Sequence, residues 1–90
     1  MRFKFEVIQK DIDKGLRCSS NGCPVALAIK RVIPNNHGVY VGYDMIKIYQ
    51  NGLSIGATSK KIQTFISRFD GCGYKERRRL KPFMAVIDLK

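Results

Sequence analysis

The segment from Pro24 to Ile33 places the strongest limit on how this 90-residue chain can fold. Proline suits the first position of a helix, where its missing N–H is not needed, and Pro34 cannot continue one, so the two prolines predict a helix between them. The apolar side chains that cover most of its circumference are Val25, Ala26, Leu27, Ala28, Ile29, Val32 and Ile33. Such a helix is too apolar for a surface position, so we expect it to be the central packing element.

Strand patterns stand on both sides of this helix. Apolar and polar residues alternate over 3–7, which is the period of a strand with one buried face. A last strand is predicted over 83–89, where Phe83, Ala85, Ile87 and Leu89 alternate with Met84, Val86 and Asp88. The same period runs from Val39 to Ile55, where Asn51-Gly52 is typical of a hairpin turn. These patterns predict a first strand, a meander of two or three strands, and a last strand.

A second helix is predicted by four apolar residues at i, i+3, i+4 and i+7, namely Ile62, Phe65, Ile66 and Phe69. Thr58 or Ser59 can cap it, and Gly71 ends it. Near the start of the chain, Asp11 is expected to cap a short helical turn whose Ile12 and Leu16 face the core and whose end takes a positive φ at Gly15.

The order strand, helix, strands, helix, strand predicts an α+β fold in a single domain over residues 1–90. We expect a mainly antiparallel sheet with two helices laid on one of its faces. Ninety residues bury only about 60% of the surface of the unfolded chain, so the apolar core is expected to give modest stability.

Two stretches resemble a loose group of small phage and prophage proteins. The first is the helix start Cys23-Pro24-Val25-Ala26-Leu27-Ala28, and the second is the helix end Phe65-Ile66-Ser67-Arg68-Phe69-Asp70, followed after a short loop by Pro82-Phe83. The resemblance implies an origin on a phage or mobile element and names no reaction. The arginine run after the second helix is not part of the shared pattern.

Positive charge is the main functional signal, because 17 Lys and Arg stand against 7 Asp and Glu, a net charge of +10. Such a charge attracts polyanions, which favours nucleic acid, an anionic membrane surface or an acidic protein, and nucleic acid, DNA or RNA, is the expected partner. The candidate binding residues form a basic run after Tyr74, extended by the polar face of the second helix: Tyr74, Lys75, Arg77, Arg78, Arg79 and Lys81, with Lys60, Lys61 and Arg68. Two other interpretations stay open, namely a solvated loop that aids solubility and an interaction protein that binds and modulates an acidic host protein.

Three cysteines and one histidine give a second, weaker hypothesis. Cys18, Cys23, His37 and Cys72 have the composition of a tetrahedral zinc site but lack a paired knuckle spacing. Cys23 also precedes a helix, whose dipole would lower the pKa of its thiol and make it reactive. The simplest interpretation is structural, with reduced thiols and no bound metal.

The sequence contains no complete catalytic motif, and its glycines lack the spacing of phosphate-binding or dinucleotide-binding loops. We therefore expect a protein that is not an enzyme and has no cofactor. No apolar run reaches 18 residues, and Met1 begins directly on the alternating pattern, so we expect no membrane insertion and a cytoplasmic location, in the host if the chain is phage-encoded. Oligomeric state is left open.

Overall fold

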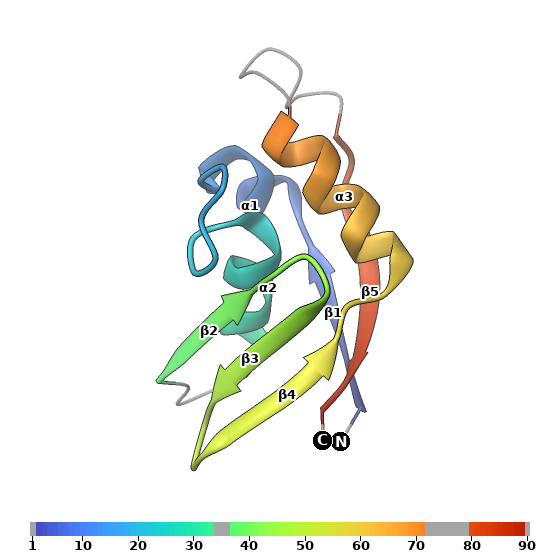
Figure 1. Ribbon diagram of the computed structural model, residues 1–90. Helices are drawn as coiled ribbons and strands as arrows, with labels where there is room; N and C mark the ends of the chain where they lie inside the picture. The colour runs from blue at the N-terminus through green and yellow to red at the C-terminus, as the bar shows by residue number, and fades with distance from the viewer. Residues whose placement is uncertain (1, 34–36, 72–79, 90) are drawn as a thin grey trace.

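The computed structural model describes residues 2–33, 37–71 and 80–89. Over these residues the chain forms a small α+β domain, which confirms the predicted class (Figure 1). The elements, in order, are β1 (Arg2–Val7), α1 (Gln9–Lys14), α2 (Pro24–Val32), β2 (Gly38–Val41), β3 (Met45–Tyr49), β4 (Leu53–Ala57), α3 (Lys60–Gly71) and β5 (Phe83–Asp88).

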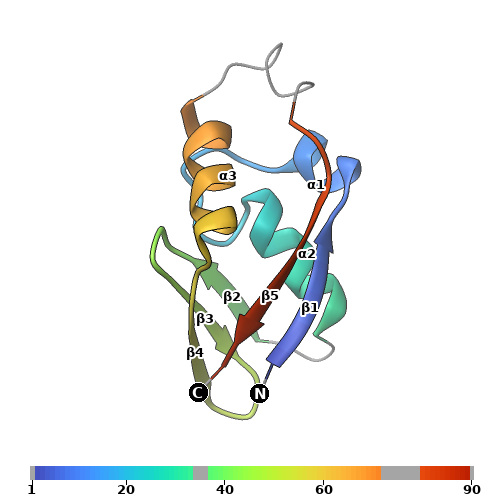
Figure 2. The ribbon, with the colours of Figure 1, turned by 90° about the vertical axis from the view of Figure 1, so that its right-hand side faces the viewer.

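The strands form two antiparallel sheets where the sequence predicted one. The chain's first and last strands, β1 and β5, pair with each other, and the predicted meander is the three-stranded sheet β2-β3-β4. A single backbone bridge between Gly56 and Leu89 connects the sheets in the described ranges. A Cβ atom at residue 56 would lie 2.7 Å from the carbonyl oxygen of Asp88, so glycine is what allows the two backbones to approach. Away from this bridge the sheets splay apart (Figure 2).

Helix α2 lies between the two sheets and contacts β1 on one side and β2 on the other. Four of its apolar side chains are completely buried: Val25, Ala26, Ala28 and Ile29. Leu27 is half-buried, and Val32 at the end of the helix is 42% exposed. The prediction of a central helix is confirmed, although its exposed stripe is wider than the sequence suggested.

The short helix α1 differs from the prediction in three respects. Ile8 stands at the cap position, and Asp11 lies inside the first turn, where its Oδ2 accepts a hydrogen bond from the Ile8 N–H at 3.0 Å. Leu16 is 60% exposed, because its N–H donates to the Gly22 carbonyl and the backbone has turned into the following loop. Gly15 has a φ of −63°, and its lack of a side chain is needed because a Cβ would lie 2.5 Å from the Pro24 ring.

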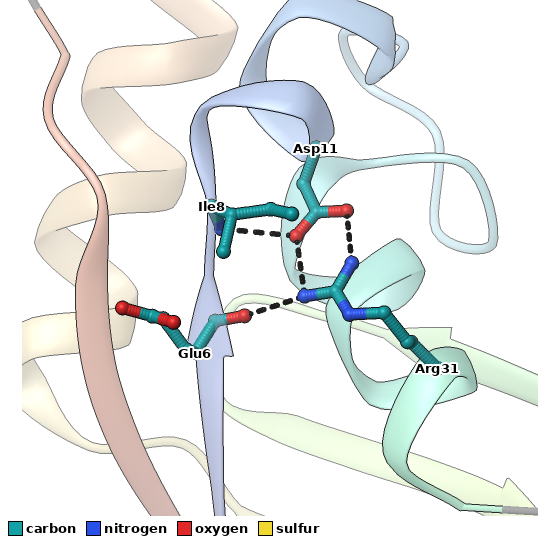
Figure 3. Close-up of polar contacts among 4 residues, drawn as sticks. All are labelled: Glu6, Ile8, Asp11 and Arg31. Atoms are coloured by element: carbon teal, nitrogen blue, oxygen red, sulfur yellow. Dashed lines mark hydrogen bonds and ion pairs between the residues drawn. The ribbon is translucent and has the colours of Figure 1, made fainter.

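An ion pair that the sequence did not predict joins α1 and α2 (Figure 3). Arg31 Nη1 donates to Asp11 Oδ1 at 2.7 Å, and Nη2 donates to Asp11 Oδ2 at 3.0 Å and to the Glu6 carbonyl at 2.8 Å. The Asp11 side chain is 6% exposed. Its hydrogen bond to the guanidinium raises the pKa of Arg31 above its ordinary value. This one arginine therefore holds α1, α2 and β1 together.

None of the helices in the described residues is both long enough and apolar enough to cross a bilayer.

Candidate nucleic-acid interface

Helix α3 is fixed at its start by the turn between β2 and β3. The Ser59 hydroxyl accepts a hydrogen bond from the Ile62 N–H at 3.3 Å, so Ser59 caps the helix. Thr58 has another role: its hydroxyl donates to the Tyr43 carbonyl at 2.6 Å, and its N–H donates to the Asp44 carbonyl at 3.1 Å. These contacts attach the start of α3 to the turn between β2 and β3.

The predicted apolar face of α3 is confirmed. Ile62, Phe65 and Phe69 are buried, and Ile66 is half-buried against the core. Since these residues turn inward, the polar face of the helix carries its basic side chains outward. Part of this polar face is covered, because the segment leading into β5 runs beside the helix (Figure 1).

Helix α3 and the segment 80–83 together line a groove of about 690 Å³. Its cations are Lys60, Lys61 and Arg68 from the helix and Lys81 from the opposite wall. We call these four the groove cations. The other lining residues are Thr64, Phe65, Leu80, Pro82 and Phe83. The two walls are separated by more than ten residues in the sequence, so the groove exists only in the folded chain.

Aromatic rings form the floor of the groove. The ring centroids of Phe65 and Phe83 are 4.7 Å apart with their planes tilted by 45°. Phe65 and Leu80 are almost fully buried, whereas Phe83 is half-buried and Pro82 is exposed. Lys61 Nζ lies 5.7 Å from the Phe83 centroid, within the range of a cation–π contact. The groove thus combines an apolar floor with positively charged walls.

Within residues 2–33, 37–71 and 80–89 no carboxylate is seen in an ion pair with a groove cation; Asp88 pairs with Arg2 and Asp11 with Arg31. All four groove cations are exposed. Like charges gathered in a concave surface with apolar walls focus their potential, which raises the local concentration of anions. The groove is therefore suited to an anionic ligand with an apolar part.

The structure brings together four of the nine residues predicted to bind nucleic acid, namely the groove cations. The other five lie outside the described residues: Tyr74, Lys75, Arg77, Arg78 and Arg79. In the sequence this basic run connects the end of α3 with Leu80, so it joins the two walls of the groove. Sequence reasoning missed Phe83 and Pro82 as part of the site, although their position directly after Lys81 was a usable signal.

The zinc hypothesis gains no support from the described part of the chain, where His37 lies away from the loop that carries Cys18 and Cys23. Val41, at the end of β2, donates its N–H to the Ser20 carbonyl in the cysteine loop. His37 precedes the other end of the same strand, which places it about 13 Å from Val41 at 3.3 Å per residue. Cys72 lies outside the described residues, and those described contain no cluster of three metal-ligating side chains.

Cys18 and Cys23 are free thiols that line a smaller cavity of about 310 Å³. The Cys18 N–H donates to Asp70 Oδ1 at 3.0 Å, so this loop is attached to the end of α3. Burial raises the pKa of the Cys23 thiol, and the backbone N–H groups of Ala26 and Val25 lower it less. The expectation of a pKa lowered by the helix dipole is therefore wrong for Cys23.

The outer face of the three-stranded sheet carries exposed apolar side chains, namely Tyr40, Met45, Tyr49, Leu53 and Ile55, which we call the sheet patch. The rings of Tyr40 and Tyr49 meet edge to face with centroids 5.8 Å apart. Lys47 lies among them, paired in register with Tyr40 and Ile55. This face differs from the groove in being mainly apolar.

Comparison with protein-family models, with curated proteins and with solved structures found no match to this chain. The resemblance to small phage and prophage proteins therefore stays a prediction. What can be inferred about function rests on the groove and on the charge of the chain.

Proposed function

We propose that this protein is a non-enzymatic module that binds nucleic acid through its basic groove. The observation that carries the proposal is the convergence of four cations, from two segments distant in sequence, on one groove without carboxylate partners in the described residues. Holding like charges close together is unfavourable in the free protein, and phosphate groups offset that repulsion. Arg77, Arg78 and Arg79 join the walls in sequence and would add further phosphate contacts.

The expected energetics follow from counterion release. Each phosphate that a lysine or arginine neutralises contributes about −0.9 to the slope of log K against log salt for duplex DNA and about −0.7 for a single strand. The proposed site of action is the cytoplasm, of the host cell if the chain is phage-encoded. Neither a metal nor a cofactor is part of the proposal.

The test compares two variants that remove the same charge. One replaces Lys60, Lys61 and Lys81 by Gln in the groove. The control replaces three exposed lysines of β1 and α1, namely Lys4, Lys10 and Lys14. Fluorescence anisotropy with labelled oligonucleotides at several salt concentrations gives the slope for each variant.

We expect the groove variant to lose up to three contacts and to reduce the magnitude of the slope by about 2 to 3, while the control keeps a slope near that of the wild type. Equal losses in the two variants would show that net charge acts without a site. Wild-type protein that binds neither DNA nor RNA at low salt would overturn the proposal.

A second candidate function, binding to an acidic host protein, is favoured by the sheet patch. Exposed apolar and tyrosine side chains are common anchors of protein interfaces, and the positive charge would speed association with an acidic partner. A pull-down from lysate with and without nuclease separates the candidates. A single protein retained after nuclease treatment, and lost in a Tyr49→Ser and Leu53→Ser variant, would support this second function.

A further inference from the structure

We infer that the groove takes single-stranded nucleic acid, with an unstacked base seated on its aromatic floor and phosphates on its walls. This inference rests on the proposed function and adds the class of strand that is bound. It depends on the floor, whereas the proposed function depends on the cations.

The floor distinguishes single strands from duplexes. A positive surface that contacted only phosphates would need no apolar interior, yet this groove is lined by Phe65, Leu80, Pro82 and Phe83. In a duplex the bases are stacked and paired, so their faces are covered and only phosphates, sugars and base edges could approach these residues. A single strand can turn a base outward and stack it on an aromatic ring, and such stacking is largely independent of sequence.

The walls are placed to hold the backbone of such a strand. Lys60, Thr64 and Arg68 recur at i, i+4 and i+8, so they form one row along the groove side of α3. The row is about 12 Å long at 1.5 Å per residue, which is the length of about three nucleotide steps in a stacked strand. Lys81 lies on the opposite wall. Phosphates can therefore be held on either side of a base that enters the groove.

Phe83 is the ring best placed to receive the base. Phe65 packs against it from the core side, and Phe83 itself stays half-buried rather than buried. The Lys61 ammonium over the ring is carried on an exposed, flexible side chain. When a base stacks on Phe83, this ammonium can move to a neighbouring phosphate, so a ring–cation contact is exchanged for base stacking and a charge-assisted hydrogen bond.

The experiment measures the binding of four labelled or competing polyanions to the wild-type chain at one low salt concentration; the two single strands and the peptide are matched in charge, and the duplex carries twice as many phosphates. They are a 12-nucleotide oligo-dT, the same length of duplex, a 12-nucleotide strand without bases, and a glutamate peptide. We expect oligo-dT to bind about 5- to 150-fold more tightly than the strand without bases, which is the range for loss of one base–aromatic stack. We expect the duplex to bind more weakly than oligo-dT as well.

Phe83→Leu tests the residue itself, because leucine keeps an apolar side chain but removes the aromatic face. We expect this variant to bind oligo-dT and the strand without bases about equally, while Tyr49→Leu, which removes an exposed ring from the sheet patch, preserves the difference. Circular dichroism checks the fold, and if Phe83→Leu is unfolded, the wild-type comparison decides alone.

The outcomes separate this inference from the proposed function. Equal wild-type affinity for oligo-dT and the strand without bases would overturn the inference and leave nucleic-acid binding intact. Absence of binding to every oligonucleotide would overturn both. Competition by the glutamate peptide as effective as that by oligo-dT would also overturn the inference, and it would favour an acidic protein as the partner.

Discussion

Arg31 and the groove cations carry the same charge but are held in different ways. Arg31 makes three hydrogen bonds, two of them to the buried Asp11 carboxylate, and joins three elements of the fold. The groove cations have no carboxylate partner in the described ranges and surround a concave surface. The difference teaches that excess charge alone does not locate a binding site. What matters is whether a cation already forms hydrogen bonds to groups within the fold or is available to a ligand.

The largest effect on the free energy of unfolding should come from a substitution in the apolar core. Ile29→Ala removes a completely buried side chain of α2 and should lower the free energy of unfolding by about 2–5 kcal/mol. Val32→Ala, on the same helix but 42% exposed, should cost much less. Urea unfolding followed by circular dichroism measures both. Similar costs would mean that α2 is not the central packing element.

An intermediate effect on stability is expected from replacing Arg31, whose hydrogen bonds are made within the fold. Arg31→Met leaves the buried Asp11 carboxylate with the Ile8 N–H and without its cation, and we expect a loss of about 1–3 kcal/mol in the free energy of unfolding. This lies below the cost of breaking a fully buried pair because the Arg31 side chain is 42% exposed to water. Arg2→Met is the matched control. The ion pair between Arg2 and Asp88 is exposed, so we expect its loss to cause no measurable change in the free energy of unfolding.

If Arg2→Met and Arg31→Met have equal free energies of unfolding, Arg31 does not stabilise the fold and is not a structural cation. Oligonucleotide binding by folded Arg31→Met should match the wild type, because Arg31 does not line the groove.

The smallest effect on stability should come from the groove. Replacing Lys60, Lys61 and Lys81 by Gln should change the free energy of unfolding by less than about 0.5 kcal/mol, because exposed side chains away from special features contribute little. Loss of the contact between Lys61 and Phe83 is offset by relief of repulsion among like charges. Thermal unfolding at the salt concentration of the binding assay checks this. A large destabilisation would assign these lysines to the fold.

Local signals in the sequence predicted most of the elements. The prolines at 24 and 34 bracket α2, the four apolar residues predicted the buried face of α3, and alternation predicted every strand. Such patterns succeed because period and capping depend on neighbours in the sequence. The conformation of Gly15 was mispredicted because it depends on a contact that is distant in the sequence. Glycine is needed at this position because the Pro24 ring of α2 packs against it.

The site was predicted only in part, and the missing parts depend on tertiary contacts. Helical periodicity grouped Lys60, Lys61 and Arg68 on one face, but nothing local shows that Lys81 lies across from them. Periodicity also assigned Phe65 to the core without showing that its ring forms the floor of a groove. The Asp11–Arg31 pair spans 20 residues and was missed, since Asp11 had a sufficient local explanation as a cap.

The bridge between Gly56 and Leu89 has a mechanical consequence for the groove. Helix α3 follows β4 after two residues, whereas Lys81 precedes β5 and Phe83 begins it, so the two walls are connected to different sheets. Within the described residues those sheets share one point of backbone pairing. The way the two sheets pack at this bridge therefore contributes to the spacing of the walls, together with the direct contact between Phe65 and Phe83. A side chain introduced at residue 56, which does not line the groove, would therefore alter it from a distance.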